Sequence, residues 1–265
     1  MMAQNSTAVT PEDRYFETAD GFKMHYRVCG TGEPLIILPG YSETEDSFDS
    51  NYEELQKHFT VYTVEYRAHG KSEAPSHGYH TERLAADFKE FLDHEDLNKV
   101  NVVAHSMGNS ILWCYFEIFG QDRIGKYILE EEGPTFMSDP AWSEEEKQTY
   151  RGVMDWDMYL RSEMIEMMFQ QKSGETADQL AERRRGLARL WKDHIANDWS
   201  DIIPTIKVDT MIMMGAKSHF AAEPLWNFMH KSIKNSKLEI VEDAGHNIHA
   251  DTPDKFNQLI IDYLS

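Results

Sequence analysis

The chain has 265 residues, of which 46 are acidic and 26 basic, so its formal net charge is −20. This length fits one domain with an insertion or two small domains, and it allows a substantial core without disulfides or structural metals. A strongly negative field repels phosphate backbones, which argues against a nucleic-acid partner, and it favours neutral substrates over polyanionic ones. The two cysteines, Cys29 and Cys114, are too few for a disulfide framework and agree with a reducing compartment.

The N-terminal segment 1–11 is polar and lacks the basic region and the apolar core of a signal peptide. No apolar run in the chain approaches the roughly 18 residues that a membrane helix needs. We therefore expect a soluble, cytoplasmic protein without a membrane partner. We expect it to act on a small molecule as a monomer or a homodimer.

Strands and helices are expected to alternate over the first half of the chain. An uninterrupted apolar run at 35–38 is typical of a strand buried on both faces of a sheet. The apolar residues of 81–93 recur at helical spacing. In chain order we predict strands at 14–18, 22–28 and 35–38, a helix at 47–58, a strand at 61–65, a helix at 81–93, a strand at 100–104, a helix at 110–119 and a strand at 127–129.

The alternation breaks at Gly133, and the following stretch is rich in Met, Trp and charge without a convincing strand. It resumes with a strand at 210–215, a helix at 223–233, a strand at 238–241 and a helix at 253–264. Alternating strands and helices predict an α/β fold with a mostly parallel sheet covered by helices. We predict a core domain from 1–137 and 204–265, and a helical cap over 138–203 inserted into it.

A serine lies between the predicted strand at 100–104 and the helix that follows it. Small residues two positions before and after Ser106, Ala104 and Gly108, would let strand and helix approach each other. Such a turn lifts the serine hydroxyl above the sheet and leaves the Met107 amide free to stabilise an oxyanion. A helix N-cap is the competing interpretation, because serine before a helix is common.

Four ordered landmarks settle this choice. The chain resembles the α/β-hydrolase family in its nucleophile turn and in the loop Leu38-Pro39-Gly40-Tyr41. It is also similar to that family in Glu65-Tyr66-Arg67-Ala68-His69-Gly70-Lys71-Ser72 and in Asp243-Ala244-Gly245-His246. The resemblance implies the α/β-hydrolase fold, Ser106 as nucleophile and the Tyr41 and Met107 amides as oxyanion donors. Ala104 departs from the usual glycine, and Pro39 from the usual histidine.

A histidine is the expected general base, since its side chain titrates near neutrality. Of the 12 histidines, His246 follows the last strand in a glycine-bearing loop at the carboxyl edge of the sheet. His249 is expected to face solvent. We interpret His69 and His105 as structural groups that flank the site.

The third triad member is displaced in this chain. The family usually has an aspartate three residues after the glycine that ends the strand at 210–215, and here that position is Ser218. Some haloalkane dehalogenases and zearalenone-type lactonases carry the acid after the preceding strand, which here ends in Glu130-Glu131-Glu132. Counting from the family's turn at Arg123 gives Glu131, whereas counting from the nucleophile gives Glu130. Neighbouring strand residues face opposite ways, so at most one of the two can easily reach His246. We predict Glu131 as the triad acid, with Glu130 as the alternative. The competing interpretation is that the three carboxylates are merely solvated.

The sequence therefore predicts a serine hydrolase that cleaves an ester or lactone of a small to medium apolar substrate. Trp156 and Met154 in the cap are candidate substrate contacts, although packing of the cap onto the core also accounts for such residues. No metal-ligand spacing, phosphate loop or dinucleotide fingerprint is present, so we expect no metal and no cofactor. The alternatives are a C–C bond hydrolase, perhydrolase or acyltransferase on the same triad, and a catalytically silent receptor with this fold.

Overall fold

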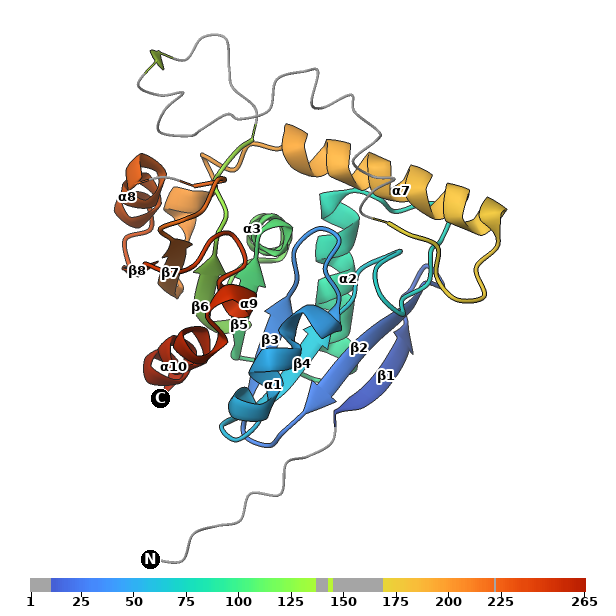
Figure 1. The fold of residues 1–265 in the computed structure, drawn as a ribbon, viewed down its shortest axis with the longest axis horizontal. Coiled ribbons are helices and arrows are strands. Elements are labelled where there is room, and N and C mark those ends of the chain that lie inside the picture. The colour runs from blue at the N-terminus through green and yellow to red at the C-terminus, as the bar shows by residue number, and fades with distance from the viewer. Residues whose placement is uncertain (1–10, 137–142, 145–168, 222) are drawn as a thin grey trace, which may run out of the picture.

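The computed structural model describes residues 11–136, 143–144, 169–221 and 223–265. Eight strands form one sheet in the order β1-β2-β4-β3-β5-β6-β7-β8 (Figure 1). Strand β2 is antiparallel to both of its neighbours, β1 and β4. Every other neighbouring pair in this order, from β4-β3 to β7-β8, is parallel. The strands are β1 (Glu12–Glu17), β2 (Lys23–Cys29), β3 (Glu33–Leu38), β4 (Phe59–Val64), β5 (Val100–His105), β6 (Ile124–Glu130), β7 (Asp209–Gly215) and β8 (Ser236–Val241).

Helices cover both faces of the sheet. Alternate residues of β3 supply the two cores: Leu35 and Ile37 pack with α1 and α10, whereas Ile36 and Leu38 pack with α2, α3 and α8. Figure 1 shows α7 running across the top of the view, above α3 and α2. The helices are α1 (Asp49–Leu55), α2 (Thr81–His94), α3 (Met107–Phe119), α7 (Ala177–Ala196), α8 (Glu223–Ser232), α9 (Ile248–Asp251) and α10 (Pro253–Leu264), with 3-10 turns η1 (Glu45–Phe48) and η2 (Ile203–Thr205).

The predicted mostly parallel sheet flanked by helices is confirmed, and each predicted strand is present. Two predicted helices differ from the structure in their bounds. The helix expected at 47–58 is divided into η1 and α1, and α3 begins at Met107 rather than at residue 110. The second difference arises because the chain turns within Ser106 alone, so that the helix starts at the next residue. No helix among the described residues is long and apolar enough to cross a membrane.

Part of the predicted cap lies outside the described residues. Trp156 and Met154, the candidate substrate contacts, are among the residues that the structure does not describe. The described part of 138–203 contains α7, whose Leu187 and Leu190 are fully buried against the core. The division into a core and a cap over 138–203 therefore stays a prediction, supported by the position of α7 over the sheet edge.

A cluster of four buried ionisable side chains joins the loops at the carboxyl edge of the sheet. Glu130 at the end of β6 accepts hydrogen bonds from the backbone N–H and Nδ1 of His249, both at 2.9 Å. Glu43 Oε1 lies 3.5 Å from His249 Nε2, and Glu43 Oε2 lies 2.7 Å from His105 Nδ1. Burial alone lowers the pKa of His249, but the carboxylates of Glu130 and Glu43 outweigh it and raise this pKa to about 10.

The expectation that His249 faces solvent is wrong. Its side chain is fully buried and stacks on Phe48, with 4.2 Å between ring centroids. Burial of this imidazolium is possible because the Glu130 carboxylate reaches it from β6. The structure likewise buries all three glutamates of the strand end, so the interpretation of them as solvated carboxylates is also wrong.

This cluster generates a stability prediction. His249→Phe keeps the ring against Phe48 but leaves the Glu130 carboxylate buried without its cation, so the free energy of unfolding should fall by about 3–5 kcal/mol. The double variant His249→Phe with Glu130→Leu should recover much of that loss, because it removes both charges. Urea unfolding of the three proteins at pH 7 measures both effects. A single variant within about 0.5 kcal/mol of the wild type would contradict the assignment of a buried ion pair.

Candidate active site

Ser106 lies in a strained turn between β5 and α3. Its backbone angles are φ 48° and ψ −124°, in the positive-φ region that non-glycine residues seldom adopt. A Cβ atom on Gly108 would lie 2.2 Å from the carbonyl oxygen of Leu38, which shows how closely α3 approaches β3. The Ser106 amide donates to the Glu130 carbonyl at 3.0 Å, so the turn is also tied to β6.

Two backbone amides are available beside this serine. Met107 is the first residue of α3, so its N–H has no acceptor within the helix. Tyr41 follows Gly40, which lies close to Ser106. A Cβ atom added to Gly40 would be 3.2 Å from the serine Cβ. The Tyr41 hydroxyl donates to the Leu187 carbonyl of α7 at 2.8 Å, which anchors this loop to the helix above it.

Glu131 lies beside His246 and is held there by two further donors. Its Oε2 is 3.4 Å from His246 Nδ1, a long contact of the kind that shortens when substrate is bound. Its Oε1 accepts from the Gly215 amide at 2.6 Å, and its Oε2 accepts from the Ser218 hydroxyl at 2.6 Å. Ser218, at the position where the family usually has the acid, thus donates a hydrogen bond to the glutamate that we predict to replace it.

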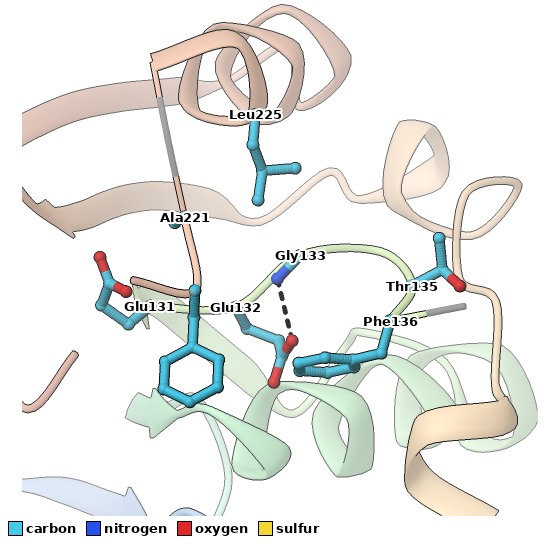
Figure 2. Close-up of a pocket in the computed structure, with 8 residues that line it drawn as sticks. Glu131, Glu132, Gly133, Thr135, Phe136, Ala221 and Leu225 are labelled. Carbon is cyan, nitrogen blue, oxygen red and sulfur yellow. Dashed lines mark hydrogen bonds between the residues drawn. The ribbon is translucent and has the colours of Figure 1, made fainter. Parts of the chain in front are cut away.

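The three consecutive glutamates at the end of β6 point in different directions. Glu130 contacts His249, whereas Glu131 is the one that faces His246. Glu131 has a φ of 50°, and this turn directs the next side chain away from both histidines. Figure 2 shows the Glu132 carboxylate directed toward the Phe136 ring, apart from the carboxylate of Glu131.

His246 is a largely buried imidazole in an ordered loop. Burial lowers its pKa below the usual value for histidine, and the hydrogen bond to Glu131 opposes that decrease. Its carbonyl lies 3.0 Å from His105 Nε2, and the two rings are 4.7 Å apart between centroids. Since His105 also contacts Glu43, the buried charge cluster holds the loop that carries His246.

Ser106 and His246 line one cavity of about 230 Å³. Its wall combines the loop around Tyr41 with aromatic residues from three other segments. Phe220 packs on the His246 ring, with centroids 4.5 Å apart, and Trp191 of α7 packs on Tyr41 at 4.9 Å. No lysine or arginine of the described residues lines this cavity, whose residues are Gly40, Tyr41, Ser42, Glu43, His105, Ser106, Phe136, Trp191, His194, Phe220, His246 and Asn247.

Several of these residues were not singled out from the sequence. Phe136, Trp191, Phe220 and His194 come from segments without a motif, and nothing in their local sequence indicates that they meet at one cavity. Ser218 was identified only as a missing acid, although a hydroxyl at that position is a hydrogen-bond donor suited to a displaced carboxylate.

Two groups of described side chains bring possible metal ligands within 4.8 Å of one another. They are Glu43, His105 and His249, and Asp13, His25 and Glu45. The first group forms the buried cluster described above. In the second, His25 Nδ1 lies 2.7 Å from Glu65 and Nε2 lies 3.1 Å from Asp13. We interpret both groups as hydrogen-bonded clusters of side chains, and the absence of a metal and a cofactor stays a prediction.

Known proteins resemble this chain over most of its length. The family model of the alpha/beta hydrolase fold matches residues 33–161. A 2-hydroxy-6-oxononadienedioate/2-hydroxy-6-oxononatrienedioate hydrolase of Pseudomonas putida is 24% identical, covering 98% of this chain and 99% of its own. A soluble epoxide hydrolase of Corynebacterium sp. is 30% identical over 110 residues, 42% of this chain and 38% of its own.

The same fold is found in a solved esterase from Exiguobacterium antarcticum. The two structures have a TM-score of 0.77 and 24% sequence identity, covering 95% of this chain and 99% of the esterase. Together with the family model and the full-length relative, this likeness shows that this chain has the α/β-hydrolase fold.

Proposed function

We propose that this hydrolase cleaves an ester or lactone of a small to medium apolar substrate through an acyl-enzyme on Ser106. The observation that carries the proposal is the contact between Glu131 and His246 beside a cavity that Ser106 also lines. The three side chains occur in the order nucleophile, acid and base along the chain, as this fold requires.

The proposed reaction uses the atoms of this site in two steps. His246 Nε2 removes the proton of Ser106, and the serine oxygen attacks the substrate carbonyl carbon. The amides of Tyr41 and Met107 stabilise the oxyanion, while Glu131 holds Nδ1–H and stabilises the imidazolium. The leaving alcohol takes the proton from Nε2. A water then gives a proton to the same nitrogen and attacks the acyl carbon, which releases the acid and restores Ser106.

A neutral substrate fits the cavity better than an anionic one. The named substrate of the Pseudomonas relative is a dioate, and carboxylates in a buried site require cationic partners. The described lining of this cavity has no lysine or arginine, and it contains the carboxylate of Glu43. These features favour an ester or lactone without a second charged group over a dicarboxylate.

Replacing the nucleophile and the acid tests the proposal directly. Ser106→Ala should lower kcat by about 10⁴–10⁶ and abolish labelling by a fluorophosphonate probe. Glu131→Gln should keep the fold and lower kcat by about 10²–10⁴, because the imidazolium loses its partner. Asp243→Asn is a matched control, since this exposed carboxylate precedes His246 on the same loop and, among the described side chains, forms an ion pair with Lys217.

Hydrolysis of a p-nitrophenyl ester series measures these losses, and the control should stay within about threefold of the wild type. Fluorophosphonate labelling that persists in Ser106→Ala would show that another residue is the nucleophile. An equal and mild loss in Glu131→Gln and Asp243→Asn would show that Glu131 is not the acid.

The pH dependence provides an independent prediction. His246 must be neutral to act as the base, and burial lowers its pKa. The acidic limb of kcat/KM should therefore lie below pH 6.5, the usual pKa of histidine. Glu131→Gln should move this limb to still lower pH, because the carboxylate raises the pKa of His246, whereas Asp243→Asn should leave it in place. A limb above pH 6.5 in the wild type would contradict the burial of the base.

A further inference from the structure

Two buried polar side chains beside the cavity take no part in the proposed reaction. His194 of α7 lines the cavity that contains Ser106, and only 2% of it is exposed. Glu132, the last of the three consecutive glutamates, is 3% exposed. Figure 2 shows the small space beside Glu132. Phe136 and Phe220 line both this space and the cavity that His194 lines, so the two side chains lie in adjoining parts of the site.

Glu132 and His194 face each other without forming a hydrogen bond. Glu132 Oε2 lies 3.8 Å from His194 Nε2, which is beyond hydrogen-bond distance. Glu132 Oε1 accepts from the Gly133 amide at 2.9 Å, but no described residue hydrogen-bonds Oε2. His194 Nδ1 also has no partner among the described residues. Buried polar atoms without partners are rare and costly in proteins, so these atoms need a functional explanation.

Burial shifts the pKa of both side chains in the direction that favours the neutral form. Burial raises the pKa of Glu132 well above its usual value, and the neighbouring carboxylate of Glu131 adds to this effect. Burial, together with His246, lowers the pKa of His194 to about 3. These shifts favour a carboxylic acid facing a neutral imidazole over a salt bridge. Because Oε1 accepts from Gly133, Oε2 carries the acid proton and is a donor, while the imidazole has one donor and one acceptor nitrogen.

We propose that Glu132 and His194 bind a hydroxyl or carbonyl group of a neutral, otherwise apolar substrate. A substrate oxygen to one side of the line joining the two atoms accepts from Glu132 Oε2–H, and a hydroxyl there also donates to His194. Because Oε2 and Nε2 are 3.8 Å apart, an oxygen offset from that line can lie about 2.8 Å from each, within hydrogen-bond distance. The inference rests on the proposed ester or lactone hydrolysis and names its substrate class: an uncharged ester or lactone whose apolar part carries a hydroxyl or carbonyl.

The aromatic surroundings favour a ring or another apolar skeleton next to that oxygen. Phe136 packs edge-on against His194, with 5.1 Å between centroids, and Trp191 lies at 6.0 Å. An added carboxylate on the substrate would meet the Glu132 acid and no cation from the described lining residues. The site therefore discriminates between a hydroxyl, a hydrogen and a carboxylate at the same position of otherwise identical substrates.

Matched aryl esters test this discrimination. The substrates are methyl phenylacetate, its ortho-, meta- and para-hydroxy derivatives, and its para-carboxy derivative. We expect at least one hydroxy isomer to exceed methyl phenylacetate by about 10- to 100-fold in kcat/KM, as a satisfied buried pair predicts. The carboxy ester should be the poorest of the series. Equal kcat/KM for the hydrogen and all three hydroxy esters would overturn the inference.

Three variants assign the preference to this pair. Glu132→Leu and His194→Phe should reduce the hydroxy-to-hydrogen ratio of kcat/KM to near one, since each removes one partner of the substrate oxygen. Glu132→Gln should retain most of the ratio, because an amide is a neutral donor of the same shape. A purely structural role would lower kcat/KM for both esters equally and leave their ratio unchanged in all three variants, which would also overturn the inference.

The pH dependence of the same ratio gives a second measurement. Ionisation of Glu132 as pH rises removes the donated proton, so the wild-type ratio should fall between neutral pH and about pH 9, where the substrate phenol, with a pKa of about 10, is still protonated. The amide of Glu132→Gln cannot ionise, and its ratio should stay constant over the same range. Effects of pH on Ser106 and His246 cancel, because they act on both esters. A wild-type ratio that is flat with pH and matches Glu132→Gln would contradict a neutral acid at this position.

Binding without turnover separates this inference from the proposed function. Calorimetric titration of Ser106→Ala with methyl phenylacetate and its hydroxy isomers should show the same preference as the kinetics, and His194→Phe in that background should remove it. If no ester is hydrolysed but the binding preference is present, the proposed ester hydrolysis fails and the substrate site stands. If esters are hydrolysed and neither measurement shows a preference, the substrate site fails and the hydrolysis stands.

Discussion

The structure of the site depends on how the chain leaves β6. Parallel pairing with β5 and β7 places this strand end between the nucleophile turn and the loop after Gly215. The backbone then turns through a positive φ at Glu131, so that three successive carboxylates reach three different partners. Glu130 forms an ion pair with His249, Glu131 contacts His246, and Glu132 faces His194. An extended strand end would alternate its side chains between two faces only, and it could not supply all three contacts.

The surroundings that stabilise each of these side chains differ. Three adjacent buried anions would otherwise repel one another strongly. Glu130 is compensated by a cation, because His249 is charged when placed between two carboxylates. Glu131 accepts hydrogen bonds from the Gly215 amide and the Ser218 hydroxyl, besides its contact with the His246 imidazole. Glu132 has no cation among the described residues, and burial raises its pKa well above the usual value. The contact of Glu131 with His246 and the raised pKa of Glu132 are thus two consequences of one crowded strand end.

Much of the fold and part of the site could be predicted from local sequence. Buried parallel strands are uninterrupted apolar runs, and the nucleophile turn is recognisable because small residues flank Ser106. Glu131 followed from counting from Arg123 in the turn that resembles the family's, whereas counting from the nucleophile gave Glu130. The partners of the other polar residues could not be predicted in the same way. The local sequence around His249 does not indicate a buried ion pair, since Glu130 and Glu43 reach its side chain from distant segments. Likewise, His194 lies on a helix whose contacts with the sheet edge depend on the tertiary fold.

The separation between Glu132 and His194 is itself informative. Two neutral groups that served only stability would pack within hydrogen-bond distance and satisfy each other. Here the imidazole is packed between Phe136 and Trp191, and the carboxyl group is fixed by the Gly133 amide. Rigid neighbours of this kind hold binding groups in place before a ligand arrives, which lowers the entropy cost of recognition. Because the acid is neutral and the described lining has no cation, the preorganised groups recognise an uncharged oxygen, and the negative field of the chain further disfavours anionic competitors.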